Sequence, residues 1–114
     1  MDTKFKEKRK FPRIRFLNPV RYQIRGIPEF NNVISDNLGL GGVSFINDRF
    51  IAPQTLLMLE INVLARVLNP VGSVAWSANV AHSDKYNLGI EFLEMDAQKK
   101  AYLKDYINLQ RGMF

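Results

Sequence analysis

Several residue types with well-defined chemistry are absent from this chain or nearly so. There is no cysteine, which excludes disulfides and thiolate metal sites. The single histidine, His82, excludes a metal site built from several histidines. It falls in the polar segment AHSDK, where we expect an exposed side chain without a functional role. Carboxylates such as Glu60 and Glu91 stand singly in predicted strands, so acid–base catalysis has no support. We therefore expect a protein that is not an enzyme and needs no metal or cofactor.

Long hydrophobic runs are also missing. The most apolar segment, TLLMLEINVLARVL, contains Glu60, Asn62 and Arg66, and it falls short of the ~18 apolar residues of a membrane span. The N-terminus is cationic but lacks the apolar run of about 7–15 residues that a signal peptide needs. We therefore expect a cytoplasmic protein with no membrane insertion. With 114 residues, 46% of them hydrophobic and 24% charged, the chain has the size and composition of one globular domain.

Outside its first residues the chain has no net charge. Residues 1–15, which include most of KEKRKFPRIRF (6–16), hold seven Lys or Arg against two acidic residues, whereas the rest of the chain holds nine of each sign. The entire net charge of +5 therefore lies in this segment. A positive field this local suits a small anion or a short acidic stretch, although a plain solvated tail is the alternative. We expect a flexible basic arm over 1–15 and a single folded domain over 16–114.

Alternation of apolar and polar residues predicts a chain built mainly from strands. Val20, Tyr22 and Ile24 alternate with polar residues, and the same period recurs further along. The predicted strands cover 20–25, 30–36, 42–47, 57–64 and 86–94, with one or two more within 66–81. From Asp96, a good helix N-cap, the period changes to that of a helix over about 96–111. Five to seven short strands before a helix indicate an all-β sandwich or barrel with a terminal helix.

Two segments have residue types suited to binding an anion. Arg9 and Arg13 lie four apart in the arm, and the planar fork of arginine grips phosphate and reads the O6 and N7 edge of guanine. The second segment, NLGLGG, begins with Asn37, whose amide can pair with a base edge, and has three glycines in its last four positions. Glycine allows positive φ and close approach of a ligand, but a tight hairpin turn uses the same residues. A phosphate loop is excluded because no Gly-Lys-Ser/Thr follows.

Together, in this order, the two segments resemble the PilZ domain, a bacterial family whose best-known members bind cyclic di-GMP. The family pattern is R-x-x-x-R followed further along by [D/N]-x-S-x-x-G, and Arg9, Arg13, Asn37 and Gly42 match it. VGSVAWS looks like the family's G-x-V-x-W strand, and NLGIEFLEMD looks like the strand that leads into its closing helix. The resemblance covers about 7–110 and implies a six-stranded antiparallel β-barrel followed by one C-terminal α-helix.

The resemblance also implies a ligand and its binding residues. Cyclic di-GMP would be clamped between the arginines and the loop, with Asn37 pairing with a guanine. Trp76 is expected to pack in the barrel core or at its rim, or else to form a wall beside the nucleotide. The implied ligand-binding residues are Arg9, Arg13, Asn37, Gly39 and Gly42, with Lys8, Lys10 and Trp76 as further candidates.

One position departs from the family pattern. Gly39 stands where the family has serine, so a side-chain hydroxyl that the resemblance places against the ligand is missing. One neutral hydrogen bond contributes about 0.5–1.5 kcal/mol, so we expect weaker binding rather than none, and about 2- to 13-fold tighter binding on Gly39→Ser. The output would pass to an unidentified downstream protein. The alternative is a degenerate PilZ-like interaction scaffold that does not bind nucleotide. The sequence does not favour general nucleic-acid binding, because no basic groove and no row of exposed aromatic residues is predicted.

Overall fold

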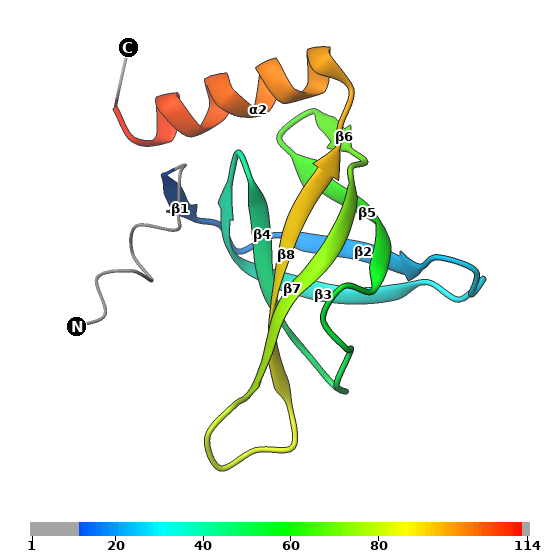
Figure 1. Ribbon diagram of the computed structural model, residues 1–114. Coiled ribbons are helices and arrows are strands. Elements are labelled where there is room, and N and C mark those ends of the chain that lie inside the picture. Colours follow the sequence, from blue (N-terminus) through cyan, green and yellow to red (C-terminus); the bar gives the residue numbers. More distant parts are fainter. Residues whose placement is uncertain (1–11, 113–114) are drawn as a thin grey trace.

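The fold is a β-barrel closed at one end by a helix (Figure 1). The computed structural model describes residues 12–112. Its elements are β1 (Arg13–Arg15), β2 (Pro19–Ile24), β3 (Asn31–Gly39), β4 (Gly42–Asn47), β5 (Leu56–Val63), β6 (Arg66–Leu68), β7 (Val71–Asn79), β8 (Tyr86–Glu94) and α2 (Ala97–Gln110).

Six of the strands form the barrel. They follow the order β3, β2, β5, β7, β8 and β4, every neighbouring pair is antiparallel, and pairing of β3 with β4 closes the ring. The short β1 pairs with the second half of β3, and β6 pairs with the end of β5. The expected six-stranded antiparallel barrel followed by one C-terminal helix is confirmed, with two short strands added.

Side chains from one face of each barrel strand fill the interior. In β5 the alternation places Leu57, Leu59 and Ile61 inside with at most 1% exposure, as the sequence period predicts. The stacked rings of Tyr22 and Phe45 lie 5.5 Å apart at their centres. The Tyr22 hydroxyl donates to Asn47 Oδ1 at 2.8 Å, so this buried polar group is satisfied. Burial nevertheless raises the pKa of Tyr22 above its ordinary value.

Helix α2 begins where the sequence predicts. The Asp96 carboxylate accepts hydrogen bonds from the backbone N–H groups of Gln98 and Lys99, which caps the first turn. Leu103 and Ile107 of α2 are buried, and Figure 1 shows the helix lying across one end of the barrel.

The glycine-rich segment differs from the expected loop. β3 continues through Asp36 to Gly39, and the turn to β4 contains only Leu40 and Gly41. The reason is that residues 37–39 pair with β1 on one side and β4 on the other, so their backbone groups are used in the sheet. Gly39 itself is extended rather than left-handed, so positive φ does not explain its presence.

The expected arm falls only partly within the described residues. Arg13–Arg15 of the arm forms β1. Residues 1–11, which include Arg9, Lys8 and Lys10, lie outside the described part of the chain.

Candidate ligand-binding face

The residues of the two sequence motifs meet on the outside of the barrel, where β1, β3 and β4 lie side by side. Leu38 and Val43 are fully buried, so the residues on either side of each must point away from the core. In register, β1 and β3 pair Arg13 with Gly39, and β3 and β4 pair Gly39 with Gly42. We call this outer surface the motif face; it consists of Arg13, Arg15, Asn37, Gly39, Gly42 and Ser44.

Arg13 is the centre of this face. Its Nη1 donates to Asn37 Oδ1 at 2.9 Å, which links the first motif directly to the second. Its Nη2 lies 3.1 Å from the point where a Cβ on Gly42 would stand, so the guanidinium extends over the glycine backbone. The structure therefore brings together four of the sequence-predicted residues: Arg13, Asn37, Gly39 and Gly42.

Both glycines of the face are explained by close approach. A Cβ on Gly39 would lie 2.9 Å from the Pro12 carbonyl oxygen and 3.0 Å from Arg13 Cγ. A Cβ on Gly42 would collide with the carbonyl oxygen of Ile90 on β8. Glycine is therefore required for β1 and β8 to lie as close as they do, and it leaves the backbone of the face uncovered.

Arg15 belongs to the same face, although it is not among the residues predicted from the motifs. Side chains alternate along a strand, so Arg13 and Arg15 point outward while Ile14 packs against the core. Arg15 is exposed and pairs in register with Asn37. The alternation in the sequence RIR was the signal that could have identified it.

Trp76 lies next to this face rather than in the core. The residue is 42% exposed, so of the positions expected for it the barrel core is excluded. The indole ring covers Gly89, where a Cβ would collide with it, and Gly89 in turn pairs with Ser44 of the motif face. A bulge in β7 between Val74 and Trp76 turns the tryptophan outward. Trp76 is thus separated from the motif face by a single strand, β8.

Two carboxylates border the arginines. Asp36 Oδ1 accepts hydrogen bonds from Asn37 Nδ2 and from the Ser44 hydroxyl. Glu91 is exposed and pairs with Gly42. The described part of the face therefore has balanced charge, and the positive excess of the chain lies toward its N-terminus.

A buried serine anchors the base of β1. The Ser35 hydroxyl lies 2.6 Å from the Phe16 carbonyl oxygen and 3.0 Å from that of Asn18, and it accepts from the Asn18 N–H. The Phe16 N–H donates to the Asp36 carbonyl at 3.1 Å. These bonds hold the connection between β1 and β2 against β3, and they thereby help to fix the position of β1 and of Arg13 on it.

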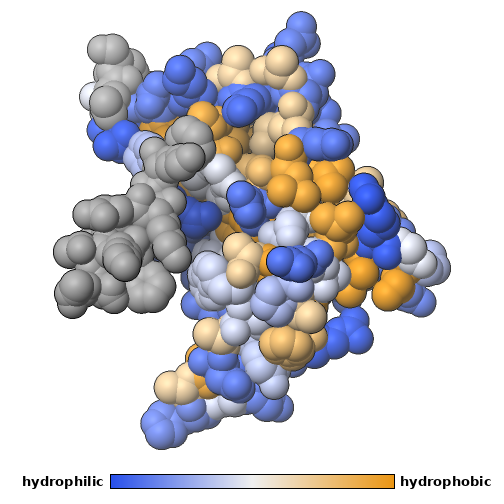
Figure 2. All heavy atoms as spheres, in the orientation of Figure 1, coloured by the Kyte–Doolittle hydropathy of each residue, from blue (hydrophilic) through white to orange (hydrophobic). Residues whose placement is uncertain are grey.

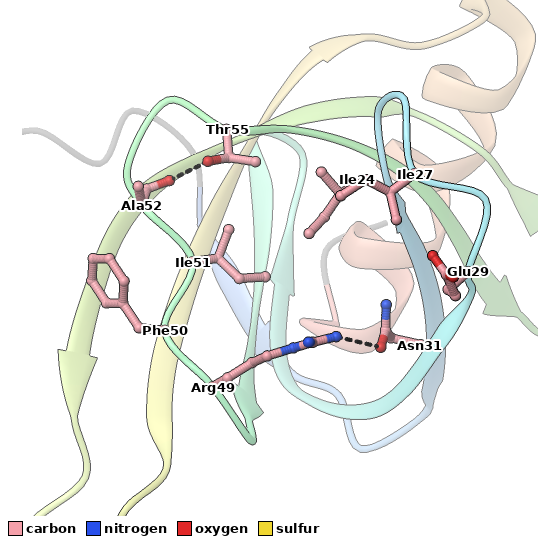
Figure 3. Close-up of a pocket in the computed structure, with 9 residues that line it drawn as sticks. All are labelled: Ile24, Ile27, Glu29, Asn31, Arg49, Phe50, Ile51, Ala52 and Thr55. Carbon is pink, nitrogen blue, oxygen red and sulfur yellow. Dashed lines mark hydrogen bonds between the residues drawn. The ribbon is translucent and has the colours of Figure 1, made fainter.

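A cavity of about 580 Å³ lies elsewhere, between the β2–β3 and β4–β5 connections (Figure 3). It is reached near Asn31, whereas the motif face includes Gly39 at the other end of β3. Its wall combines apolar Ile24 and Ile51 with Arg49, whose Nη2 donates weakly to Asn31 Oδ1 at 3.4 Å, and with Glu29. No motif residue lines it, and the presence of Glu29 makes it a poor site for a dianion.

Several large hydrophobic side chains are exposed outside the motif face. They include Met58 on β5, Val67 on β6 and Leu93 on β8, and Figure 2 shows a group of hydrophobic side chains over the part of the barrel where β5 lies. Among residues 12–112, no group of three or more His, Cys, Asp or Glu could hold a metal ion. In the same part of the chain, no helix has the length and apolar character to cross a membrane.

A family model described as the PilZ domain matches residues 7–109, nearly the whole chain. The chain belongs to the PilZ domain family. This confirms the resemblance inferred from the sequence, and the match includes all residues of the motif face.

Solved structures with the same fold come from several bacteria. The Bacillus subtilis inhibitor of motility MotI/DgrA is 22% identical with a TM-score of 0.77, over 91% of this chain and 52% of that one. Escherichia coli YcgR in complex with cyclic di-GMP is 16% identical with a TM-score of 0.72, over 92% of this chain and 47% of that one. Borreliella burgdorferi PlzA in complex with cyclic di-GMP is 15% identical with a TM-score of 0.60, over 92% of this chain and 43% of that one.

This PilZ chain spans about half the length of those three proteins. No curated protein sequence matches it significantly.

Proposed function

We propose that this PilZ domain is a receptor for cyclic di-GMP that binds its ligand on the motif face. The observation that carries the proposal is the contact of Arg13 with Asn37 above Gly39 and Gly42, because it joins the two halves of the motif in one place. The cyclic di-GMP complexes of YcgR and PlzA, which share the fold, support the choice of ligand.

The chemistry of the face suits this ligand. Cyclic di-GMP carries two phosphates, and arginine binds phosphate through paired, charge-assisted hydrogen bonds. Arg13 and Arg15 project from one side of β1, while the bare backbone at Gly39 and Gly42 lets a flat ring system approach closely. The exposed indole of Trp76 offers an aromatic wall that only one strand, β8, separates from Ser44.

Arg9, Lys8 and Lys10 complete the proposed clamp from the arm. The arm contacts the bound dinucleotide, and the surface formed by the complex is read by a downstream protein in the bacterial cytoplasm. The domain acts as a binding module, and its output is carried by that partner.

Calorimetric titration of the full chain with cyclic di-GMP tests the proposal. Arg13→Ala and Arg9→Ala should each weaken binding by about 10-fold or more, since a hydrogen bond to a charged group contributes about 1.5–3 kcal/mol. Arg25→Ala is the matched control: it removes the same charge from an exposed position just beyond β2, and it should leave the affinity unchanged.

Two results would contradict the proposal. The first is that the wild-type chain does not bind cyclic di-GMP at ~100 μM, a concentration that reveals all but very weak complexes. This result would favour the alternative of a PilZ-like interaction scaffold that does not bind nucleotide. Equal binding of random oligonucleotides, with an affinity that falls steeply as salt rises, would favour general nucleic-acid binding.

A further inference from the structure

A β-bulge on β3 places a carboxylate on the motif face. The register changes from Ser35 opposite Phe45 to Asn37 opposite Ser44, which leaves Asp36 as the extra residue of the bulge. In a regular strand, Asp36 and Asn37 would point to opposite faces. Here Asp36 Oδ1 accepts hydrogen bonds from Asn37 Nδ2, at 2.9 Å, and from the Ser44 hydroxyl. Both carboxylate and amide therefore belong to the same side of the sheet, as bulges often arrange near binding sites.

The amide of Asn37 is already engaged at both ends. Its oxygen accepts from Arg13 and its nitrogen donates to Asp36. This orientation is fixed by chemistry, because a guanidinium can only donate hydrogen bonds and a carboxylate can only accept them. Asn37 is thus placed to connect Arg13 with Asp36 rather than to turn its oxygen toward a base.

Asp36 offers what the Watson–Crick edge of guanine requires. That edge presents two adjacent donors, N1–H and the exocyclic N2 amine, which need acceptors. Asp36 Oδ1 has two donors, while Oδ2 has no hydrogen-bond partner among residues 12–112 and keeps both of its lone pairs. The Ser44 hydroxyl and the Asn37 amide hold the carboxylate in one orientation, so Oδ2 is preorganised.

We propose that Asp36, rather than Asn37, is the residue of this chain that recognises guanine, with Asn37 and Ser44 as positioning residues. The inference rests on the proposed function, since it assigns base specificity within the same site. Asp36 Oδ2 accepts hydrogen bonds from guanine N1–H and N2–H, while Arg13 binds the adjacent phosphate. Adenine lacks the N1–H and N2 amine, so the same carboxylate discriminates against an adenine dinucleotide.

The test compares three cyclic dinucleotides by calorimetry: cyclic di-GMP, cyclic di-IMP, which lacks only the N2 amine, and cyclic di-AMP. Wild-type chain should prefer cyclic di-GMP over cyclic di-IMP by about 10-fold, the effect of one hydrogen bond to a charged acceptor. In Asp36→Asn the single amide oxygen stays with the Ser44 and Asn37 donors, so an NH₂ group faces the donors of guanine. This variant should lose about 10-fold or more in affinity for cyclic di-GMP, and its preference over cyclic di-IMP should fall within about 2-fold.

Asp48→Asn is the matched control, because Asp48 is an exposed aspartate whose partner is Lys85 on a different part of the barrel. It should bind all three ligands as wild type does. Unchanged discrimination in Asp36→Asn, or an equal loss for cyclic di-GMP and cyclic di-IMP, would show that Asp36 does not recognise the base. If Asp36→Asn does not fold, wild-type binding still decides: equal affinity for cyclic di-GMP and cyclic di-IMP overturns the inference. Failure of wild-type chain to bind cyclic di-GMP would instead refute the proposed function itself.

Discussion

The substitution Gly39→Ser tests how closely β1 lies against β3. It restores the serine of the family pattern, but the added Cβ would stand 2.9 Å from the Pro12 carbonyl oxygen and 3.0 Å from Arg13 Cγ. The first of these contacts is with backbone, so β1 must move outward by a few tenths of an ångström. Because β1 carries Arg13, the movement shifts the guanidinium as well.

Two opposing effects follow from this geometry. Insertion of atoms into a packed site costs typically about 1–3 kcal/mol, and we expect the lower end because β1 is a three-residue edge strand that can yield. A loss of about 1 kcal/mol lowers the Tm by about 4–8 °C for a domain of roughly this size. The serine hydroxyl, if it reaches the ligand, contributes about 0.5–1.5 kcal/mol to binding. The strain is present with and without ligand, so it lowers the Tm and not directly the affinity. The affinity falls only through the displaced Arg13 guanidinium, and we expect that loss to offset the gain from the hydroxyl, so the tightening expected from the sequence alone should not appear in Gly39→Ser compared with wild type.

Gly39→Ala separates the two effects, since it adds the Cβ without the hydroxyl. Thermal unfolding should show a similar decrease in Tm for the alanine and serine variants. Calorimetry with cyclic di-GMP should show the serine variant binding about 2- to 13-fold more tightly than the alanine variant. A wild-type Tm in Gly39→Ala would refute the close packing of β1 on β3. Equal affinities of the two variants would show that the side chain at position 39 does not face the ligand.

Three further predictions concern the barrel itself. Gly42→Ala places a Cβ against a backbone carbonyl of β8, and it should destabilise the fold by about 3 kcal/mol or more in urea unfolding; loss below 1 kcal/mol would contradict the spacing of β4 and β8. Tyr22→Phe removes the hydrogen bond to Asn47 and should cost about 1–3 kcal/mol. Burial raises the pKa of Tyr22, so the neutral hydroxyl contributes its full share of the free energy of unfolding below about pH 10 and loses it as the pH rises through the folded-state pKa. Wild type should therefore lose stability more steeply than Tyr22→Phe in alkaline solution. Parallel curves of stability against pH for the two proteins would contradict the burial of Tyr22. Gly89→Ala should push Trp76 into solvent and shift its fluorescence to longer wavelength, whereas an unchanged spectrum would mean that the indole does not lie on Gly89.

Much of the fold could be predicted from local sequence. Leu57, Leu59 and Ile61 alternate with less buried residues because β5 has one side in the core, and that period is visible without a structure. Asp96 predicts the start of α2 because its carboxylate can accept from the first free N–H groups of a helix. Such features depend on neighbours within a few residues in the chain, which is why sequence reasoning finds them.

The candidate site could be predicted only in part. Motif spacing identified Arg13 and Asn37, and the structure brings them within hydrogen-bond distance. The glycine-rich segment was expected to be a loop, yet it is mostly strand, because β1 and β4 pair with both of its edges. Trp76 was expected in the core, at the barrel rim or beside the ligand, and a bulge in β7 turns it outward, away from the core.

The sequence by itself therefore determined the strand periods, the terminal helix, the family and the residues of its binding motif. Only the tertiary structure decided why Gly42 must be glycine, since the colliding carbonyl belongs to Ile90 on another strand. It also decided the position of Asp36, which depends on a change of register between β3 and β4. Bulges and close backbone contacts arise from how two distant segments pair, so neither is encoded in the period of either segment alone.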